Sequence, residues 1–287
     1  MVYNEIQPPI HFSKHVECYW EMLFMPGELD EFIELLMPTC TFNIIFTNQS
    51  LYLKTSLNCP RIPIPTGATF IGQRSSCISF FSKKPVRIFG IRFKPFAFAN
   101  IIKTPIYLLN DQFLALDKLF DLNITCKKYI QQIATFPDIE TKTHLVNNLL
   151  LILFDDSFLI DQPLRAQLNF ILDRKGMMKV NELFSEFGIS KVTLRKHFIN
   201  KVGLPPKKIS RIWRMNYFLQ LKEKMPNENL TSICLMAGFY DQAHFIKEFK
   251  SLLGSPPREF FQQKPQLLKI SMESISRRFT NQYDPRV

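Results

Sequence analysis

The sequence has no long apolar run and no recognisable export signal. Its longest uninterrupted stretch of apolar residues, Leu149 to Phe154, is far shorter than the ~18 residues that a membrane-spanning helix needs. The first residues, Met1 to Glu5, are polar and lack the basic segment and apolar stretch of a secretion signal. We therefore expect a cytoplasmic protein that does not enter a membrane.

Motifs for metal binding and catalysis are also missing. The cysteines are scattered, and no two have the CxxC-type spacing of a zinc ligand pair. His11 and His15 are four residues apart, but no cysteine or carboxylate at a suitable spacing completes a site, so we interpret them as surface or packing residues. No nucleophile elbow, phosphate-cradling loop or Cys–His pair is recognisable. We expect no metal, no cofactor and no enzymatic activity.

What the sequence does contain is an uneven distribution of charge. Residues 1–161 carry 14 Lys and Arg against 15 Asp and Glu, a net charge of −1, whereas residues 162–287 carry 22 against 10, a net charge of +12; together they give +11. A basic segment favours a polyanion such as nucleic acid, because neutralising phosphates releases counterions. A merely solvated basic surface is the alternative that charge alone leaves open.

The first part of the chain has the alternating pattern of β-strands. Phe42–Phe46 and Ile88–Phe93 are rich in β-branched and aromatic residues. In the second run Phe89, Ile91 and Phe93 alternate with Gly90, Arg92 and Lys94. Proline and glycine turn signals separate such runs. This pattern predicts a small β-barrel or sandwich over residues 1–107.

Residues 108–162 have a helical pattern. Apolar residues recur there at three- and four-residue steps: Phe113, Leu116, Leu119, Phe120, Leu145, Leu149 and Leu153. Pro137 divides the segment in two. We predict a helical connector that either packs on the β domain or contacts a second copy of the chain, and the sequence does not choose between these roles.

Two helix-turn-helix patterns occupy residues 163–261. This motif needs a first helix, a tight turn, and a second helix whose outer face is free to enter a DNA groove. Gly188 and Gly238 can each take the left-handed conformation that ends a first helix. Ser190 and Asp241 are good N-caps. A recognition helix is therefore predicted directly after each cap.

Each predicted recognition helix has a core face and an outward face. Leu194 and Phe198 in the first helix, and Phe245 and Phe249 in the second, lie four residues apart and face the core. Side chains suited to base edges face outward: Val192, Arg195, Lys196, Gln242, Ala243 and Lys247. A longer helix between the units would let them enter successive major grooves, about 34 Å apart.

At this point the sequence resembles the DNA-binding domain of the AraC/XylS regulators, from about Leu164 to Phe261. The most specific stretch is Ala237–Lys250, followed by Gly254–Phe260. The first unit matches more weakly, through Ser190, Thr193-Leu194, Phe198 and Gly203–Pro206. The resemblance implies an all-α domain of seven helices with two helix-turn-helix subdomains. Phe218 stands where the family more often has Ala.

The resemblance also assigns roles by position. Base reading falls on Val192, Arg195 and Lys196, then on Gln242, Ala243 and Lys247, and the two helices add Thr193 and His244 to the DNA-binding set. His244 is equally suited to packing or to a phosphate contact. Further phosphate contacts are expected from Ser190, Lys207, Lys208, Asp241 and Lys250.

The N-terminal residues resemble the divergent, cupin-like β-barrel sensor domains found in part of this family, but no sugar specificity carries over. Arg92 and Lys94 lie on one strand face and could receive an anionic effector, although a solvent-facing pair is the favoured interpretation. The many phenylalanines are interpreted as core residues in preference to a pocket lining. Residues 262–287 form a basic tail, either disordered or contacting phosphates.

We therefore hypothesise an α+β protein that binds DNA sequence-specifically and regulates transcription in response to an effector. Its expected partners are double-stranded DNA, RNA polymerase, an unidentified small molecule and a second copy forming a homodimer. One alternative is an architectural DNA-binding module without an effector. The other is a DNA-targeted repair enzyme, which would need an active or zinc-bound cysteine in a recognisable motif, and none is present.

Overall fold

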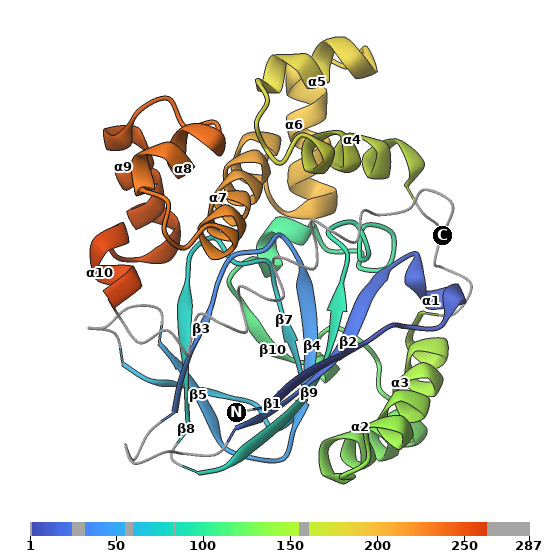
Figure 1. Ribbon diagram of the computed structural model, residues 1–287. Helices are drawn as coiled ribbons and strands as arrows, with labels where there is room; N and C mark the ends of the chain where they lie inside the picture. The colour runs from blue at the N-terminus through green and yellow to red at the C-terminus, as the bar shows by residue number, and fades with distance from the viewer. Residues whose placement is uncertain (1, 25–31, 55–59, 83, 155–160, 263–287) are drawn as a thin grey trace.

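The structure is a computed structural model that describes residues 2–24, 32–54, 60–82, 84–154 and 161–262. Strands dominate the N-terminal part, and seven helices make up the described C-terminal part (Figure 1). The expected order, a β domain followed by an all-α domain, is confirmed. The expected basic tail begins with Gln262, which ends the last helix, and residues 263–287 lie outside the described part.

Two antiparallel sheets form the N-terminal domain. The strands are β1 (Val2–Ile6), β2 (Val16–Phe24), β3 (Phe32–Leu36), β4 (Phe42–Thr47), β5 (Leu51–Lys54), β6 (Ile62–Ile64), β7 (Gly67–Ile71), β8 (Ile78–Ser82), β9 (Val86–Phe93) and β10 (Phe113–Ala115). The first sheet has the order β1-β2-β9-β4-β7-β10, and the second has the order β3-β8-β5-β6. A short helix, α1 (Ile10–Ser13), separates β1 from β2.

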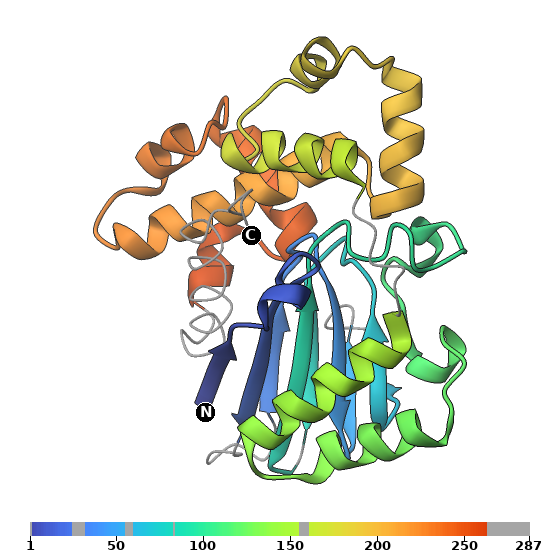
Figure 2. The ribbon, with the colours of Figure 1, turned by 90° about the vertical axis from the view of Figure 1, so that its right-hand side faces the viewer.

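Both faces of the six-stranded sheet are covered by other elements. Successive side chains of a strand point to opposite faces, so each strand contributes to two cores. On one face Ile45 and Ile88 pack against Leu53 and Phe80 of the second sheet. The other face is covered by α2 (Ile124–Thr135) and α3 (Ile139–Phe154), which lie across the strands (Figure 2). Phenylalanines fill this second core: Phe12, Phe42, Phe46, Phe70, Phe89, Phe93, Phe98 and Phe154.

One part of the expected helical connector is not helical. Phe113–Ala115 pairs antiparallel with Thr69–Ile71 as the edge strand β10, between two short 3-10 turns, η1 (Ile106–Leu109) and η2 (Leu116–Lys118). The apolar spacing that suggested a helix also fits a short strand followed by a 3-10 turn. Backbone pairing with a strand distant in sequence decided the conformation, and local spacing does not report such pairing.

Seven described helices form the C-terminal domain: α4 (Gln162–Asp173), α5 (Val180–Phe187), α6 (Lys191–Val202), α7 (Pro206–Lys224), α8 (Leu230–Met236), α9 (Gln242–Leu253) and α10 (Pro257–Gln262). Gly188 ends α5 with φ 61°, in the left-handed region that favours glycine. Helix α7 buries Ile209, Ile212 and Leu219 and forms the centre of this domain. The predicted order of helices and turns is confirmed.

The core of the helical domain continues into the β domain. Apolar residues of the N-terminal part, including Met37, Cys77 and Phe96, belong to the same buried cluster as Leu204 and Leu252 of the helical domain. A backbone hydrogen bond of 2.8 Å from the N–H of Cys77 to the carbonyl of Leu252 crosses the boundary. The two domains are therefore packed against each other through an apolar contact.

Within the described residues, no helix has the length and apolar character needed to cross a lipid bilayer. Nor do these residues contain a group of three or more His, Cys, Asp and Glu side chains arranged to hold a metal ion. His11 is exposed and His15 is buried, so the two histidines of the short motif face different surroundings.

Candidate nucleic-acid interface

The first predicted recognition helix, α6, presents a basic exposed face. Ser190 caps it by accepting a hydrogen bond of 3.1 Å from the N–H of Thr193, and the hydroxyls of these two residues lie 2.8 Å apart. Leu194 is buried, whereas Arg195 and Lys196 are exposed. Val192 is 78% exposed, so its apolar side chain is accessible to a partner group such as a thymine methyl.

The second recognition helix, α9, is built in the same way. Asp241 caps it by accepting a hydrogen bond of 2.7 Å from the N–H of His244. The side chains of α9 that are expected to contact DNA are all exposed: Gln242, Ala243, His244, Lys247 and Lys250. They extend along one side of the helix, and the helix buries Phe245 and Phe249 on the other side.

Two exposed residues of this surface were not predicted. Ile246 is 39% exposed and Tyr240, directly before the cap of α9, is 90% exposed. Ile246 lies four residues after Gln242 and four before Lys250, so helical spacing could have placed it on the reading face. Tyr240 had no such signal, because the residue before an N-cap follows no helical periodicity.

The two lysines at the start of α7 that were expected to contact phosphates differ in their surroundings. Lys207 is exposed, whereas Lys208 is only partly exposed. Desolvation, assisted by the nearby Arg211, lowers the pKa of Lys208, while Cys40 and Asp111 of the β domain and Glu248 of α9 counteract it. These neighbours place the Lys208 ammonium between the β domain and the Arg211 and Glu248 side chains of the helical domain.

A groove of about 560 Å³ lies between the two helix-turn-helix units. Its basic lining comes from the start of α5, from α6, α7 and α9: Lys179, Lys191, Arg195, Lys207, Arg211, Arg214 and His244. The groove thus brings together Arg195, Lys207 and His244 from the predicted set. Ala243, Lys247 and Lys250 instead line a separate hollow of about 570 Å³ beside α9.

Arg92 and Lys94, for which a solvent-facing pair was favoured over an anionic effector site, are both only partly exposed. Nη1 of Arg92 lies 2.9 Å from Oε1 of Glu5 and 3.6 Å from Oε1 of Glu17, and Nη2 donates to the hydroxyl of Tyr3 at 3.0 Å. Desolvation lowers the pKa of Lys94 to about 8. The chain's own carboxylates thus compensate the charge of the Arg92 guanidinium.

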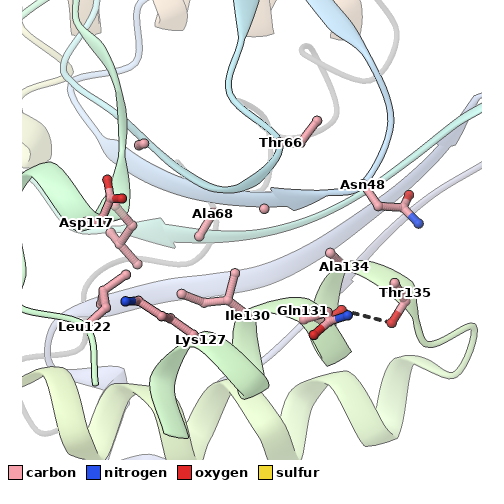
Figure 3. Close-up of a pocket in the computed structure, with 13 residues that line it drawn as sticks. Asn48, Thr66, Ala68, Asp117, Leu122, Lys127, Ile130, Gln131, Ala134 and Thr135 are labelled. Carbon is pink, nitrogen blue, oxygen red and sulfur yellow. Dashed lines mark hydrogen bonds between the residues drawn. The ribbon is translucent and has the colours of Figure 1, made fainter. Parts of the chain in front are cut away.

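A hollow of about 360 Å³ opens between β7, η2 and α2 in the N-terminal domain (Figure 3). Ala68 and Ile130 are buried in its wall. Asp117, Lys127 and Gln131 form an exposed polar rim. The hollow therefore combines an apolar wall with groups of both charges.

Comparisons with known proteins divide the chain in the same two parts. Residues 183–263 match a family model described as a helix-turn-helix domain. Residues 4–115 match one described as a domain of unknown function (DUF6597). Among curated proteins, none matches this sequence significantly.

Solved structures of ToxT from Vibrio cholerae resemble the chain along most of its length. One, at 12% identity, covers 85% of this chain and 98% of that chain with a TM-score of 0.49. Another, of wild-type ToxT from strain SCE256 with bound unsaturated fatty acid, covers 84% of this chain and 98% of that chain at 13% identity and a TM-score of 0.44.

The matched helix-turn-helix segment spans both recognition helices and the helix that joins them. Within it the two helices have side-chain caps and exposed polar faces at the positions that the family motif predicts. Residues 183–263 of the C-terminal part are thus a helix-turn-helix domain, in agreement with the resemblance of this segment to the AraC/XylS regulators.

Proposed function

We propose that the chain controls transcription by reading two successive major grooves of one operator with α6 and α9. The observation that carries this proposal is the common support of the two helices. Both belong to one buried cluster with α7, a helix of 19 residues. A rigid connection of this kind fixes the separation of two reading helices, as binding to adjacent grooves from one side of the duplex requires.

In this proposal the exposed side chains divide into two classes. Arg195, Lys196, Gln242 and Lys247 read base edges, and Val192 and Ala243 contact thymine methyl groups. Thr193 and His244 flank these residues. Backbone phosphates are contacted at the helix starts, by the Ser190 hydroxyl and by the N–H groups that follow Ser190 and Asp241, and by the basic side chains of Lys207, Lys208 and Lys250.

Selection of binding sites from a random duplex pool, followed by footprinting, tests the proposal. We expect one or two protected sites of about 20 base pairs, with two sequence elements one helical turn apart. Uniform coating of DNA that disappears with added salt would contradict sequence-specific reading.

Three substitutions then separate the two classes of contact. Arg195→Ala and Gln242→Ala should each lose about 1–3 kcal/mol of discrimination between the operator and random DNA, because each removes a base contact. Lys207→Ala should weaken binding to both DNAs equally and lower the salt dependence by about one phosphate contact. Equal losses on both DNAs for the first two variants would contradict their assignment.

We also propose that a small-molecule effector binds the N-terminal domain and alters DNA binding. The hollow beside α2 supports this, because its volume of about 360 Å³ falls within the usual range of ligand pockets, about 300–1,000 Å³. A thermal-shift screen of metabolites on the full chain, followed by titration of operator binding, tests it. A ligand that raises the melting temperature without changing operator affinity would contradict a regulatory role.

The remaining partners follow from the same role. The exposed Leu151 and Ile152 near the end of α3 support contact with a second copy, and RNA polymerase is the proposed target of the DNA-bound protein. The proposed location is the cytoplasm, and the proposed role is non-enzymatic. Sedimentation of the full chain tests the homodimer, with a concentration-independent monomer as the contradicting result.

A further inference from the structure

A buried carboxylate lies at the junction of the two helix-turn-helix units. Glu248 of α9 is 6% exposed, and its Oε1 is 2.8 Å from Nε of Arg211 and 3.2 Å from Nε2 of His244. Its Oε2 is 3.8 Å from Nη2 of Arg214. Glu248 thus faces α7, whereas Gln242 and Lys247 of the same helix are exposed.

The arginine that Glu248 contacts also holds the turn of the second unit. Nη1 of Arg214 donates to the carbonyl of Gly238 at 3.3 Å, and its guanidinium lies 5.0 Å from the centre of the Phe239 ring. Gly238 and Phe239 form the turn between α8 and α9. One side of α7 therefore contacts both the turn and the recognition helix of this unit.

The same side of α7 contacts the first unit. The hydroxyl of Ser210 donates to the carbonyl of Gly176, between α4 and α5, at 2.7 Å. A Cβ atom added to Gly238 would come within 2.9 Å of Cγ of Met177, so the two units also meet directly. The ion pairs of Glu248 thus lie where the relative orientation of the units is set.

A carboxylate at this place is unfavourable for DNA binding by charge alone. The groove between the units is lined by six Lys and Arg side chains and His244, and Glu248 is the one acidic side chain among its described lining residues. A negative charge here repels phosphates, and burial adds a desolvation cost. The compensating effect is structural, because Glu248 brings cationic groups of α7 and α9 together.

We propose that Glu248 is a positioning residue that fixes the rotation of α9 relative to α7, so that both recognition helices face the duplex in register. This inference rests on the proposed two-groove reading. It predicts that Glu248 acts on the coupling between the two reading helices, and that it contacts no base itself.

The first test compares Glu248→Gln with Glu259→Gln in the full chain. Both variants remove one negative charge, but Glu259 is an exposed residue of α10. We expect Glu259→Gln to strengthen binding to the selected operator and to random DNA by the same factor. Glu248→Gln should leave random-DNA affinity unchanged or stronger and lower the operator-to-random ratio by about tenfold.

The second test changes the distance between the two sequence elements of the operator. One inserted base pair rotates the second element by roughly 34° and should weaken binding of the original chain. Glu248→Gln should lose less affinity on this insertion than the original chain does, because its two units are less tightly coupled. A merely stabilising residue would change affinity without changing the tolerance to spacing.

Three results would overturn the inference. Glu248→Gln could strengthen operator and random DNA alike, as expected of a simple repulsive charge. It could weaken both alike, or it could retain the spacing dependence of the original chain. Failure of the proposed function is distinct from all three, because the original chain would then select no operator.

If thermal melting shows that Glu248→Gln does not fold, Arg211→Gln carries the test. Arg211 is partly exposed at 28%, and the substitution breaks the 2.8 Å ion pair from the other side. Arg258→Gln, on exposed α10, is the matched control for loss of one positive charge. Greater spacing tolerance in Arg211→Gln alone supports the inference, and equal tolerance in both variants overturns it.

Discussion

The imidazole of His15 shows how strongly the fold can alter a single side chain. It is 2% exposed, and its ring centre lies 6.3 Å from that of Phe96. Burial, together with the nearby Lys94 and Lys14, lowers its pKa from 6.5 to about 4. The neutral form is therefore favoured in the folded state.

This pKa predicts a loss of stability in mild acid. The unfolded chain takes up a proton at an ordinary pKa near 6.5, whereas the folded chain takes it up only near pH 4. The stability that neutral His15 contributes to the folded state is therefore fully present above pH 6.5, and it declines as the pH falls toward 4. Between pH 7.5 and 5 we expect His15 to lower the free energy of unfolding by about 2 kcal/mol.

Urea unfolding of the original chain and of His15→Gln at these two pH values measures this effect. The other titrating groups are common to both proteins, so the difference in their pH dependence reports His15. Parallel pH dependences would contradict the prediction.

At the residue scale, the sequence indicates which side chains face outward but not what they contact. Arg195 and Gln242 were predicted from helical spacing and are exposed. The ion pairs of Glu248 with Arg211 and of Arg92 with Glu5 were not predicted, because each joins residues that lie on separate elements. Glu248 also lies between the core and outward faces of α9, where spacing assigns no role.

At the scale of an element, helix α7 was also predicted only in part. Its position between two units was predicted, yet the place of Phe218, where related proteins more often have Ala, was not. Phe218 is fully buried, and its ring centre is 4.5 Å from that of Phe245 and 6.1 Å from that of Phe249. An aromatic cluster therefore joins α7 to α9.

We predict that Phe218→Ala lowers the free energy of unfolding by about 3–5 kcal/mol, because it removes a buried ring and leaves a cavity. Phe136→Ala is the control, since Phe136 is exposed and its loss should change stability by less than about 0.5 kcal/mol. Chemical denaturation of both variants measures the difference. A loss below about 1 kcal/mol for Phe218→Ala would show that the cluster repacks.

The helix caps were predictable because they depend on residues next to them in the chain, as with Ser190 and Asp241. The strand β10 was not, because its conformation depends on pairing with β7, about forty residues earlier in the chain.

At the scale of the whole molecule, the end of α6 is joined to the β domain. Nδ2 of Asn110 donates to the carbonyl of Gly203 at 2.6 Å, and Nζ of Lys201 donates to the carbonyl of Ala99 at 2.9 Å. The bond from Cys77 to Leu252 joins the end of α9 to the same domain. Both recognition helices are thus supported by the β domain as well as by α7.

Gly203→Ala and Gly254→Ala test this support as a matched pair. The two glycines have φ of 92° and 90°, so alanine is strained at both. A Cβ atom at Gly203 would also lie 2.5 Å from Oδ1 of Asn110, whereas at Gly254 it would meet nothing within 4 Å. We expect Gly203→Ala to lose about 1–3 kcal/mol more stability than Gly254→Ala.

Unfolding of both variants in urea measures this excess. Adding Asn110→Ala to Gly203→Ala should reduce it, because the nearest clashing atom is then absent. Equal losses of stability for the two glycine variants would show that Asn110 moves aside without a measurable free-energy cost.

The shared core between the domains has a consequence for how such a chain evolves. The helical domain buries Leu204 and Leu252 in the same apolar cluster as Met37 and Phe96 of the β domain. A chimaera that joined these helices to an unrelated sensor would expose that surface to water and favour aggregation. The two halves are therefore not freely exchangeable by recombination, and a substitution on one side of the shared core constrains which residues the other side can accept.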